Sequence, residues 1–86
     1  MDKKSKRRLN ERKFQDWKEL PNGGRKYRLS VNGRRGWKAF YVKIVDSNEE
    51  TVRFFQEIYD NKGVLAEVHE KFPVDKGHKN VKEEES

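Results

Sequence analysis

The side chains that could contact phosphate groups are concentrated in the first half of this chain. The segment from Met1 to Val45 holds 15 Lys and Arg residues and 4 Asp and Glu residues. Between Leu20 and Val45 there are seven basic residues and no carboxylate. Side chains of one charge sign repel one another unless a partner of opposite sign lies near them. The pattern therefore indicates compensation by the acidic second half, an anionic ligand, or both.

Aromatic residues are interleaved with these basic residues in a stretch that reads as β-strands. Rings and cations on an open sheet face are typical of proteins that hold single-stranded nucleic acid, because each base stacks on a ring with about 1–3 kcal/mol while cations contact phosphates. We therefore expect nucleic acid, above all RNA, as the partner. The alternative is that the rings form a homodimer or other protein interface. The candidate nucleic-acid-binding residues are Lys26, Arg28, Arg34, Arg35, Trp37, Tyr41, Lys43 and Arg53.

A second alternative is a metal-free endoribonuclease. Such an enzyme needs an acid, a base and a cation for the phosphate. His69, Tyr59 and Arg53 supply these three groups and are the candidate catalytic residues. The chain has no Cys, which excludes disulfides, thiolate metal sites and thiol nucleophiles.

A metal centre is the remaining chemistry that the residue types allow. The possible ligands are His69, Glu70, Asp75 and His78. Neighbouring residues of a strand point to opposite faces, so His69 and Glu70 cannot both bind one ion, and His78 follows a glycine. We therefore predict no metal site and no cofactor.

The elements that position these residues follow from hydrophobic periodicity. Period-two alternation predicts four strands, over Arg25–Val31, Trp37–Val45, Thr51–Tyr59 and Val64–Phe72. The loops between them have about five residues or fewer, which allows only antiparallel neighbours in the order 1-2-3-4. Asp60-Asn61-Lys62-Gly63 has the composition of a type I turn followed by a left-handed glycine.

The N-terminal part contains good helix formers over Glu11–Leu20, with Phe14 and Trp17 on one stripe. The predicted fold is α+β, with one N-terminal helix packed on a four-stranded antiparallel meander. We expect residues 1–10 to be a basic flexible arm, residues 11–74 to be a single domain and residues 75–86 to be a flexible, acidic-ended tail.

The two faces of the predicted sheet differ in composition. In the first strand, Tyr27, Leu29 and Val31 are expected in the core, with Lys26 and Arg28 beside Tyr41; a one-residue change in the following turn would reverse this strand. Tyr41 and Phe55 are expected on the open face. The residues expected beneath the helix are Phe40, Val42, Ile44, Val52, Phe54 and Ile58.

The acidic residues of the second half allow two interpretations. Glu49, Glu50, Glu67, Glu70 and the Glu83–Glu85 run are expected to be solvated. The alternative is that they neutralise the basic half of the same chain or of a second copy. The chain has no apolar run near the roughly 20 residues of a membrane span and no signal-peptide stretch, so we expect a cytoplasmic protein with no membrane partner.

The small size, the positive charge and the order of helix and meander resemble RelE-type ribosome-dependent toxins. The similarity is greatest over Asp16–Val45. Those toxins usually begin with a strand and have two helices, which this sequence does not predict. The resemblance implies ribonuclease activity and adds to the endoribonuclease alternative.

Overall fold

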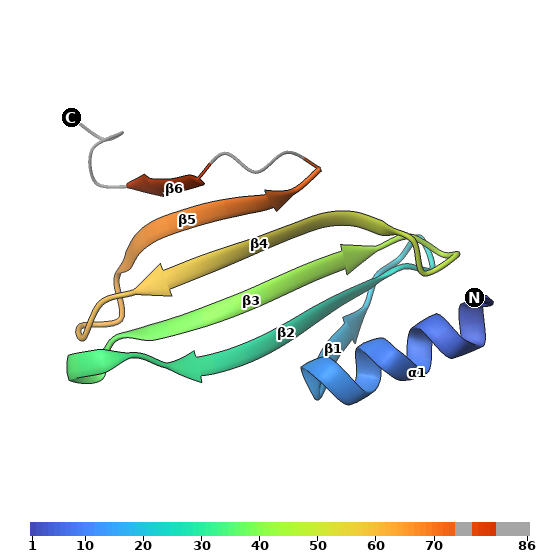
Figure 1. Ribbon diagram of the computed structural model, residues 1–86, viewed down its shortest axis with the longest axis horizontal. Coiled ribbons are helices and arrows are strands. Elements are labelled where there is room, and N and C mark those ends of the chain that lie inside the picture. The colour runs from blue at the N-terminus through green and yellow to red at the C-terminus, as the bar shows by residue number, and fades with distance from the viewer. Residues whose placement is uncertain (74–76, 81–86) are drawn as a thin grey trace.

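The computed structural model describes residues 1–73 and 77–80, in which one α-helix packs on a single antiparallel sheet (Figure 1). The helix is α1 (Lys3–Phe14), and the strands are β1 (Asp16–Glu19), β2 (Arg25–Asn32), β3 (Lys38–Val45), β4 (Thr51–Tyr59), β5 (Leu65–Phe72) and β6 (Gly77–Asn80). Strands β1 to β5 lie side by side in sequence order, and the short β6 pairs with β5. The predicted α+β class is confirmed, but the four expected strands are only the centre of a larger sheet.

The helix begins and ends earlier than the sequence predicted. Asp2 is the N-cap, and its side chain accepts a hydrogen bond from the Ser5 backbone N–H at 2.8 Å. Gln15 ends the helix in the left-handed conformation, with φ 64°. Residues 3–10, expected as a flexible arm, are therefore helical, because Lys and Arg are good helix formers and Asp is a favoured N-cap. No helix in the described part of the chain is long and apolar enough to span a membrane.

The segment after the helix forms a strand where a helix was expected. Strand β1 pairs with β2, with Trp17 opposite Tyr27. The hairpin closes through a hydrogen bond from the Leu20 N–H to the Gly24 carbonyl at 2.9 Å. Gly24 packs directly against the end of β3, where an added Cβ would lie 2.2 Å from the Val45 carbonyl oxygen. This contact makes Gly24 the residue that allows the hairpin to lie on the sheet.

The central strands lie close to where the alternation predicted them. Strand β4 has the predicted bounds, and β2, β3 and β5 differ from the predicted bounds by one residue at one end. The turn after β4 also has the predicted form: the Gly63 N–H donates to the Asp60 carbonyl at 3.0 Å, and Gly63 has φ 81°. The Asp60 side chain also fixes the turn, because its Oδ1 accepts a hydrogen bond from the Lys62 N–H at 2.9 Å. Local sequence therefore determines this hairpin.

The register between β3 and β4 corrects the predicted faces. Val42 lies opposite Phe55, and Lys43 lies opposite Phe54. A register shift next to Val45 places Val52 in a bulge. A shift of one residue exchanges the two faces of a strand. The even-numbered residues of β3 and β4 therefore lie on opposite faces, although they were expected to share one.

The face of the sheet that α1 covers, hereafter the helix face, carries the main core. Phe14 of α1 packs on Tyr27 and Phe54, with ring centroids 5.6 and 6.5 Å away. Phe14, Tyr27 and Val45 are buried, and Leu29 and Tyr41 pack against them. Tyr27, Leu29 and Phe54 therefore belong to the core as predicted. Tyr41 does too, although it was expected on the open face.

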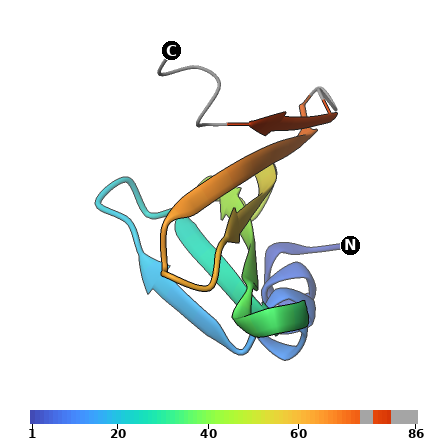
Figure 2. The ribbon, with the colours of Figure 1, turned by 90° about the vertical axis from the view of Figure 1, so that its left-hand side faces the viewer.

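The opposite face, hereafter the open face, has no helix over it in the part of the chain that the structure describes. Phe40, Val42 and Ile44 lie on it, contrary to the prediction that they would lie beneath the helix. Figure 2 shows that the sheet is strongly twisted and curved. Val42 is fully buried and Phe55 is 7% exposed, so the curved sheet encloses a small second core on this face.

Candidate nucleic-acid interface

The eight predicted binding residues lie in three different places. Three are on the open face (Lys26, Arg28 and Arg53), three are in the connection between β2 and β3 (Arg34, Arg35 and Trp37), and two are on the helix face (Tyr41 and Lys43). The predicted surface therefore divides into an open-face part, an exposed end and a part beneath α1.

The open-face part is centred on a stack of Arg28 on an aromatic ring. The Arg28 guanidinium carbon lies 4.1 Å from the centroid of Phe40. Phe40 meets Tyr59 edge to face, with ring centroids 5.5 Å apart. Burial, reinforced by the Glu57 carboxylate, raises the pKa of Tyr59, and Arg28 acts in the opposite direction. The stack therefore consists of the Arg28 cation on Phe40, next to a Tyr59 ring that stays neutral at physiological pH.

Strand β1 extends this basic surface toward the edge of the sheet. Lys18 lies opposite Lys26, and Asp16 lies opposite Arg28. Together with Trp17, these four residues line a shallow pocket of about 280 Å³. Lys18 was missed because its segment was expected to be helical, where its side chain would not reach the sheet.

Arg53 also stacks on a ring of the open face, but it already has an acidic partner. Its guanidinium carbon lies 4.0 Å from the centroid of Phe55. Its Nε donates to Glu70 Oε1 at 2.9 Å. The hydrogen bond to Glu70 raises the pKa of Arg53, against the effect of burial. Arg53 is therefore less available to an outside anion than Arg28.

The connection between β2 and β3 forms an exposed basic end of the molecule. It contains the short 3-10 helix η1 (Arg34–Gly36) and is followed by Trp37, which is 37% exposed. A Cβ at Gly36 would lie 3.3 Å from the Cβ of Asn61, so this connection packs beside the β4–β5 turn. Figure 1 shows both turns at the same end of the sheet, away from the β3–β4 loop.

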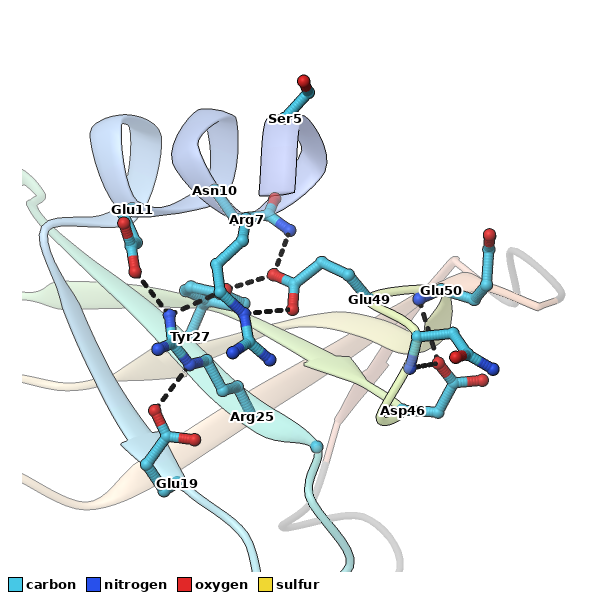
Figure 3. Close-up of polar contacts among 12 residues, drawn as sticks. Ser5, Arg7, Asn10, Glu11, Glu19, Arg25, Tyr27, Asp46, Glu49 and Glu50 are labelled. Carbon is cyan, nitrogen blue, oxygen red and sulfur yellow. Dashed lines mark hydrogen bonds and ion pairs between the residues drawn. The ribbon is translucent and has the colours of Figure 1, made fainter. Parts of the chain in front are cut away.

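At the opposite end, a buried carboxylate compensates part of the basic helix (Figure 3). Glu49, expected to be solvated, is 3% exposed. It accepts hydrogen bonds from Asn10 Nδ2 at 3.0 Å and from Arg7 Nε at 3.1 Å, and also from the Tyr27 hydroxyl. The neutralisation that was considered as an alternative therefore occurs here, between the β3–β4 loop and α1.

Two further groups of ion pairs complete the compensation within the described residues. Lys6 pairs with Glu50, and Arg25 pairs with both Glu11 and Glu19 at 2.6 Å. Within residues 1–73 and 77–80, the ion pairs of the segment from Met1 to Val45 involve Lys6, Arg7 and Arg25, and its other basic residues form none. Lys26, Arg28, Arg34 and Arg35 belong to this set without an ion pair among the described residues.

The candidate catalytic residues do not converge. His69 lies opposite Gln56 in the β4–β5 register, whereas the neighbouring odd-numbered residues Arg53 and Tyr59 point to the other face of the sheet. A bulge at Ala66 of β5 produces this arrangement, because it moves His69 from the expected position opposite Phe55 to one opposite Gln56. The structure therefore does not assemble the predicted acid, base and cation.

The candidate metal ligands do not come together as a metal site within the described part of the chain. Among the residues that the structure describes, no group of three or more His, Cys, Asp or Glu residues could hold a metal ion. His78 lies opposite His69 in the β5–β6 register. Asp75 and the Glu83–Glu85 run lie outside the described residues.

The surroundings of Glu49 predict how stability depends on pH. Burial disfavours its charge, but the hydrogen bonds from Tyr27, Asn10 and Arg7 prevail and lower the pKa of Glu49 below the ordinary value of 4.5. A carboxyl group with a lowered folded-state pKa adds stability above its unfolded pKa, and this stability is lost as the pH falls through the folded-state value. We therefore expect the free energy of unfolding to decrease below pH 4.5.

Urea unfolding of the wild type and of Glu49→Gln at several pH values between 6 and about 2.5 checks this expectation. The variant should be less stable at pH 6 and should lose less stability in acid than the wild type. If the free energy of unfolding fell equally with pH in the two proteins, the lowered pKa of Glu49 would be contradicted.

No match to this chain is found among family models, curated proteins or solved structures.

Proposed function

We propose that this protein binds single-stranded nucleic acid, with RNA as the expected ligand, on its open face. The observation that carries the proposal is the position of Arg28, which stacks on Phe40 at 4.1 Å and forms no ion pair with a described carboxylate. Arginine on an aromatic ring presents a planar cation to phosphates and a flat surface to bases.

The neighbouring residues support a path for a strand across the sheet. Lys18 and Lys26 lie side by side at one edge, where they can contact successive phosphates. Tyr59, which meets Phe40 edge to face, offers a ring for a base beyond the Arg28–Phe40 stack. The exposed pair Arg34 and Arg35, with Trp37, continues the basic surface at the end of the molecule.

The proposal changes the residues that were expected from the sequence to bind the bases. Tyr41 stacks with Phe54 in the core, with ring centroids 6.2 Å apart, and is not a surface platform. Lys43 donates to Asn10 Oδ1 at 2.9 Å beneath α1. On the open face, we expect bases to stack on Arg28 over Phe40 and on Tyr59, in place of Tyr41.

Fluorescence anisotropy with a labelled single-stranded RNA, measured over a range of salt concentrations, tests the proposal. We expect the wild type to bind with a logarithmic salt slope of about −0.7 for each phosphate that is contacted. The double variant Lys26→Ala/Arg28→Ala should bind about 10–100-fold more weakly, because it loses two phosphate contacts and a stacking surface. Its salt slope should become shallower by about 1.4.

Lys3→Ala/Lys4→Ala is the matched control, since it removes the same charge from exposed positions on α1. We expect this control to retain affinity within about threefold, because α1 contributes only non-specific attraction. Equal losses in the two double variants would contradict the proposed surface. Absence of binding at low salt would contradict nucleic-acid binding altogether. A DNA competitor of the same sequence measures the preference for RNA.

A further inference from the structure

A pocket on the helix face carries three lysines around aromatic rings. It lies between α1, β3, β4 and β5, and its volume is about 370 Å³. This volume is within the usual range for small-ligand sites. The side chains that define it are those of Lys13, Lys43, Lys71, Phe14, Phe54 and Phe72. None of the described residues that line it is acidic.

None of the three lysines forms an ion pair with a carboxylate in the part of the chain that the structure describes. Lys43 Nζ donates to the neutral Asn10 Oδ1 at 2.9 Å. Burial and the charge of Lys13 lower the pKa of Lys43, with Glu49 acting in the opposite direction. Glu49 already accepts hydrogen bonds from Tyr27, Asn10 and Arg7. A bound anion would relieve the repulsion between Lys13 and Lys43.

The third lysine reaches the pocket because of a bulge in β5. Phe54 lies opposite Phe72, and Phe55 lies opposite Glu70, so Lys71 is the extra residue between them. A bulge re-aims the side chains at its position, and here both Lys71 and Phe72 line the pocket. Phe72 is 42% exposed and leaves an uncovered ring beside the ammonium groups.

We propose that this pocket binds a nucleoside monophosphate, with the base against the exposed Phe72 ring and the phosphate among Lys13, Lys43 and Lys71. Flat aromatic rings favour a base over an alkyl chain, because rings in contact gain stacking energy. The three ammonium groups can donate charge-assisted hydrogen bonds to the oxygens of one phosphate. The site is on the helix face and is separate from the open face, so it goes beyond the proposed function and does not depend on it.

Isothermal titration with 5′-AMP, adenosine, inorganic phosphate and decanoate tests the site in the full chain. We expect 5′-AMP to bind with a dissociation constant at or below about 1 mM, and each of the other three compounds to bind at least about tenfold more weakly. Lys71→Gln should weaken 5′-AMP binding about tenfold by removing one charge-assisted contact. Phe72→Ala should weaken 5′-AMP binding and leave the weak binding of inorganic phosphate unchanged.

Lys26→Gln on the open face is the control and should leave 5′-AMP affinity unchanged. A thermal melt of each variant verifies that the fold is intact. An unaltered affinity of Lys71→Gln for 5′-AMP would overturn the site. So would a failure of the wild type to bind 5′-AMP at 5 mM, on the order of five times the largest dissociation constant expected. Tighter binding of decanoate than of 5′-AMP would overturn the ligand class. RNA affinity should be unchanged in Lys71→Gln, which separates a failure here from a failure of the open-face proposal.

Discussion

Glu49→Ala is expected to lower the free energy of unfolding by about 3–5 kcal/mol, because it removes one partner of a buried ion pair and leaves the other groups without theirs. The buried carboxylate accepts hydrogen bonds from the Tyr27 hydroxyl, Asn10 and Arg7. After the substitution these donors would remain at the helix–sheet contact without an acceptor. A domain of this size has a total stability of about 5–15 kcal/mol, so a large fraction would be lost.

Urea unfolding followed by circular dichroism measures this effect, and the adjacent residue provides the control. Glu50 pairs with Lys6, but its side chain is 62% exposed. Glu50→Ala should therefore cost less than about 1 kcal/mol, as is usual for surface ion pairs. Similar losses for the two variants would show that Glu49 is not the buried anchor of α1.

Gly24→Ala is the second substitution with a large expected effect, a loss of about 3 kcal/mol of unfolding free energy through overpacking. The added Cβ would lie 2.2 Å from the Val45 carbonyl oxygen, which belongs to the backbone and cannot rotate away. To relieve the clash, the β1–β2 hairpin would have to move off β3. This movement would also disturb the hydrogen bond from the Gly24 N–H to Asn22 Oδ1.

Thermal and urea unfolding of Gly24→Ala, with Ser30→Ala as a control, provides the measurement. Ser30 is exposed on β2, so its replacement should change stability by no more than about 0.5 kcal/mol. If Gly24→Ala unfolds within that same margin of the wild type, the close approach of this hairpin to β3 is not part of the native fold.

The central sheet could be predicted from sequence because its signals are local. Alternation of apolar and polar residues, together with the Asp60–Gly63 turn, was sufficient for β4 and its hairpin with β5. Such signals depend on residues that are close in the chain. They did not determine which residues face each other across β3 and β4, because a single bulge at Val52 reverses the faces.

The helix could not be placed correctly by apolar spacing. Phe14 and Trp17 are three residues apart, which suits one helical stripe, but Gln15 adopts a left-handed conformation between them and ends the helix. The real signals were the N-cap at Asp2 and the helix-forming Lys and Arg residues after it. Phe14 then anchors a largely polar helix through its contact with Tyr27.

The sequence predicted some of the residues of the candidate interface, but it did not predict which face of the sheet each of them occupies. Lys26 and Arg28 lie two residues apart on one strand, so they share a face whatever the register. Tyr41 and Lys43 were assigned to that face by assuming a four-residue turn between β2 and β3, but Asn32 pairs with Lys38, which places Tyr41 opposite Leu29 and Lys43 opposite Tyr27. The burial of Glu49 depends on the position of α1 and had no signal in the acidic loop that contains it.

Chemical-shift mapping by NMR is the most direct test of the claim that the open face holds RNA. On titration of ¹⁵N-labelled protein with single-stranded RNA at low salt, the largest amide shifts should occur at Lys18, Lys26, Arg28, Phe40 and Tyr59. The amides of α1, from Lys3 to Phe14, should shift less. Shifts confined to α1, or shifts in α1 as large as those at the five named residues, would contradict the account.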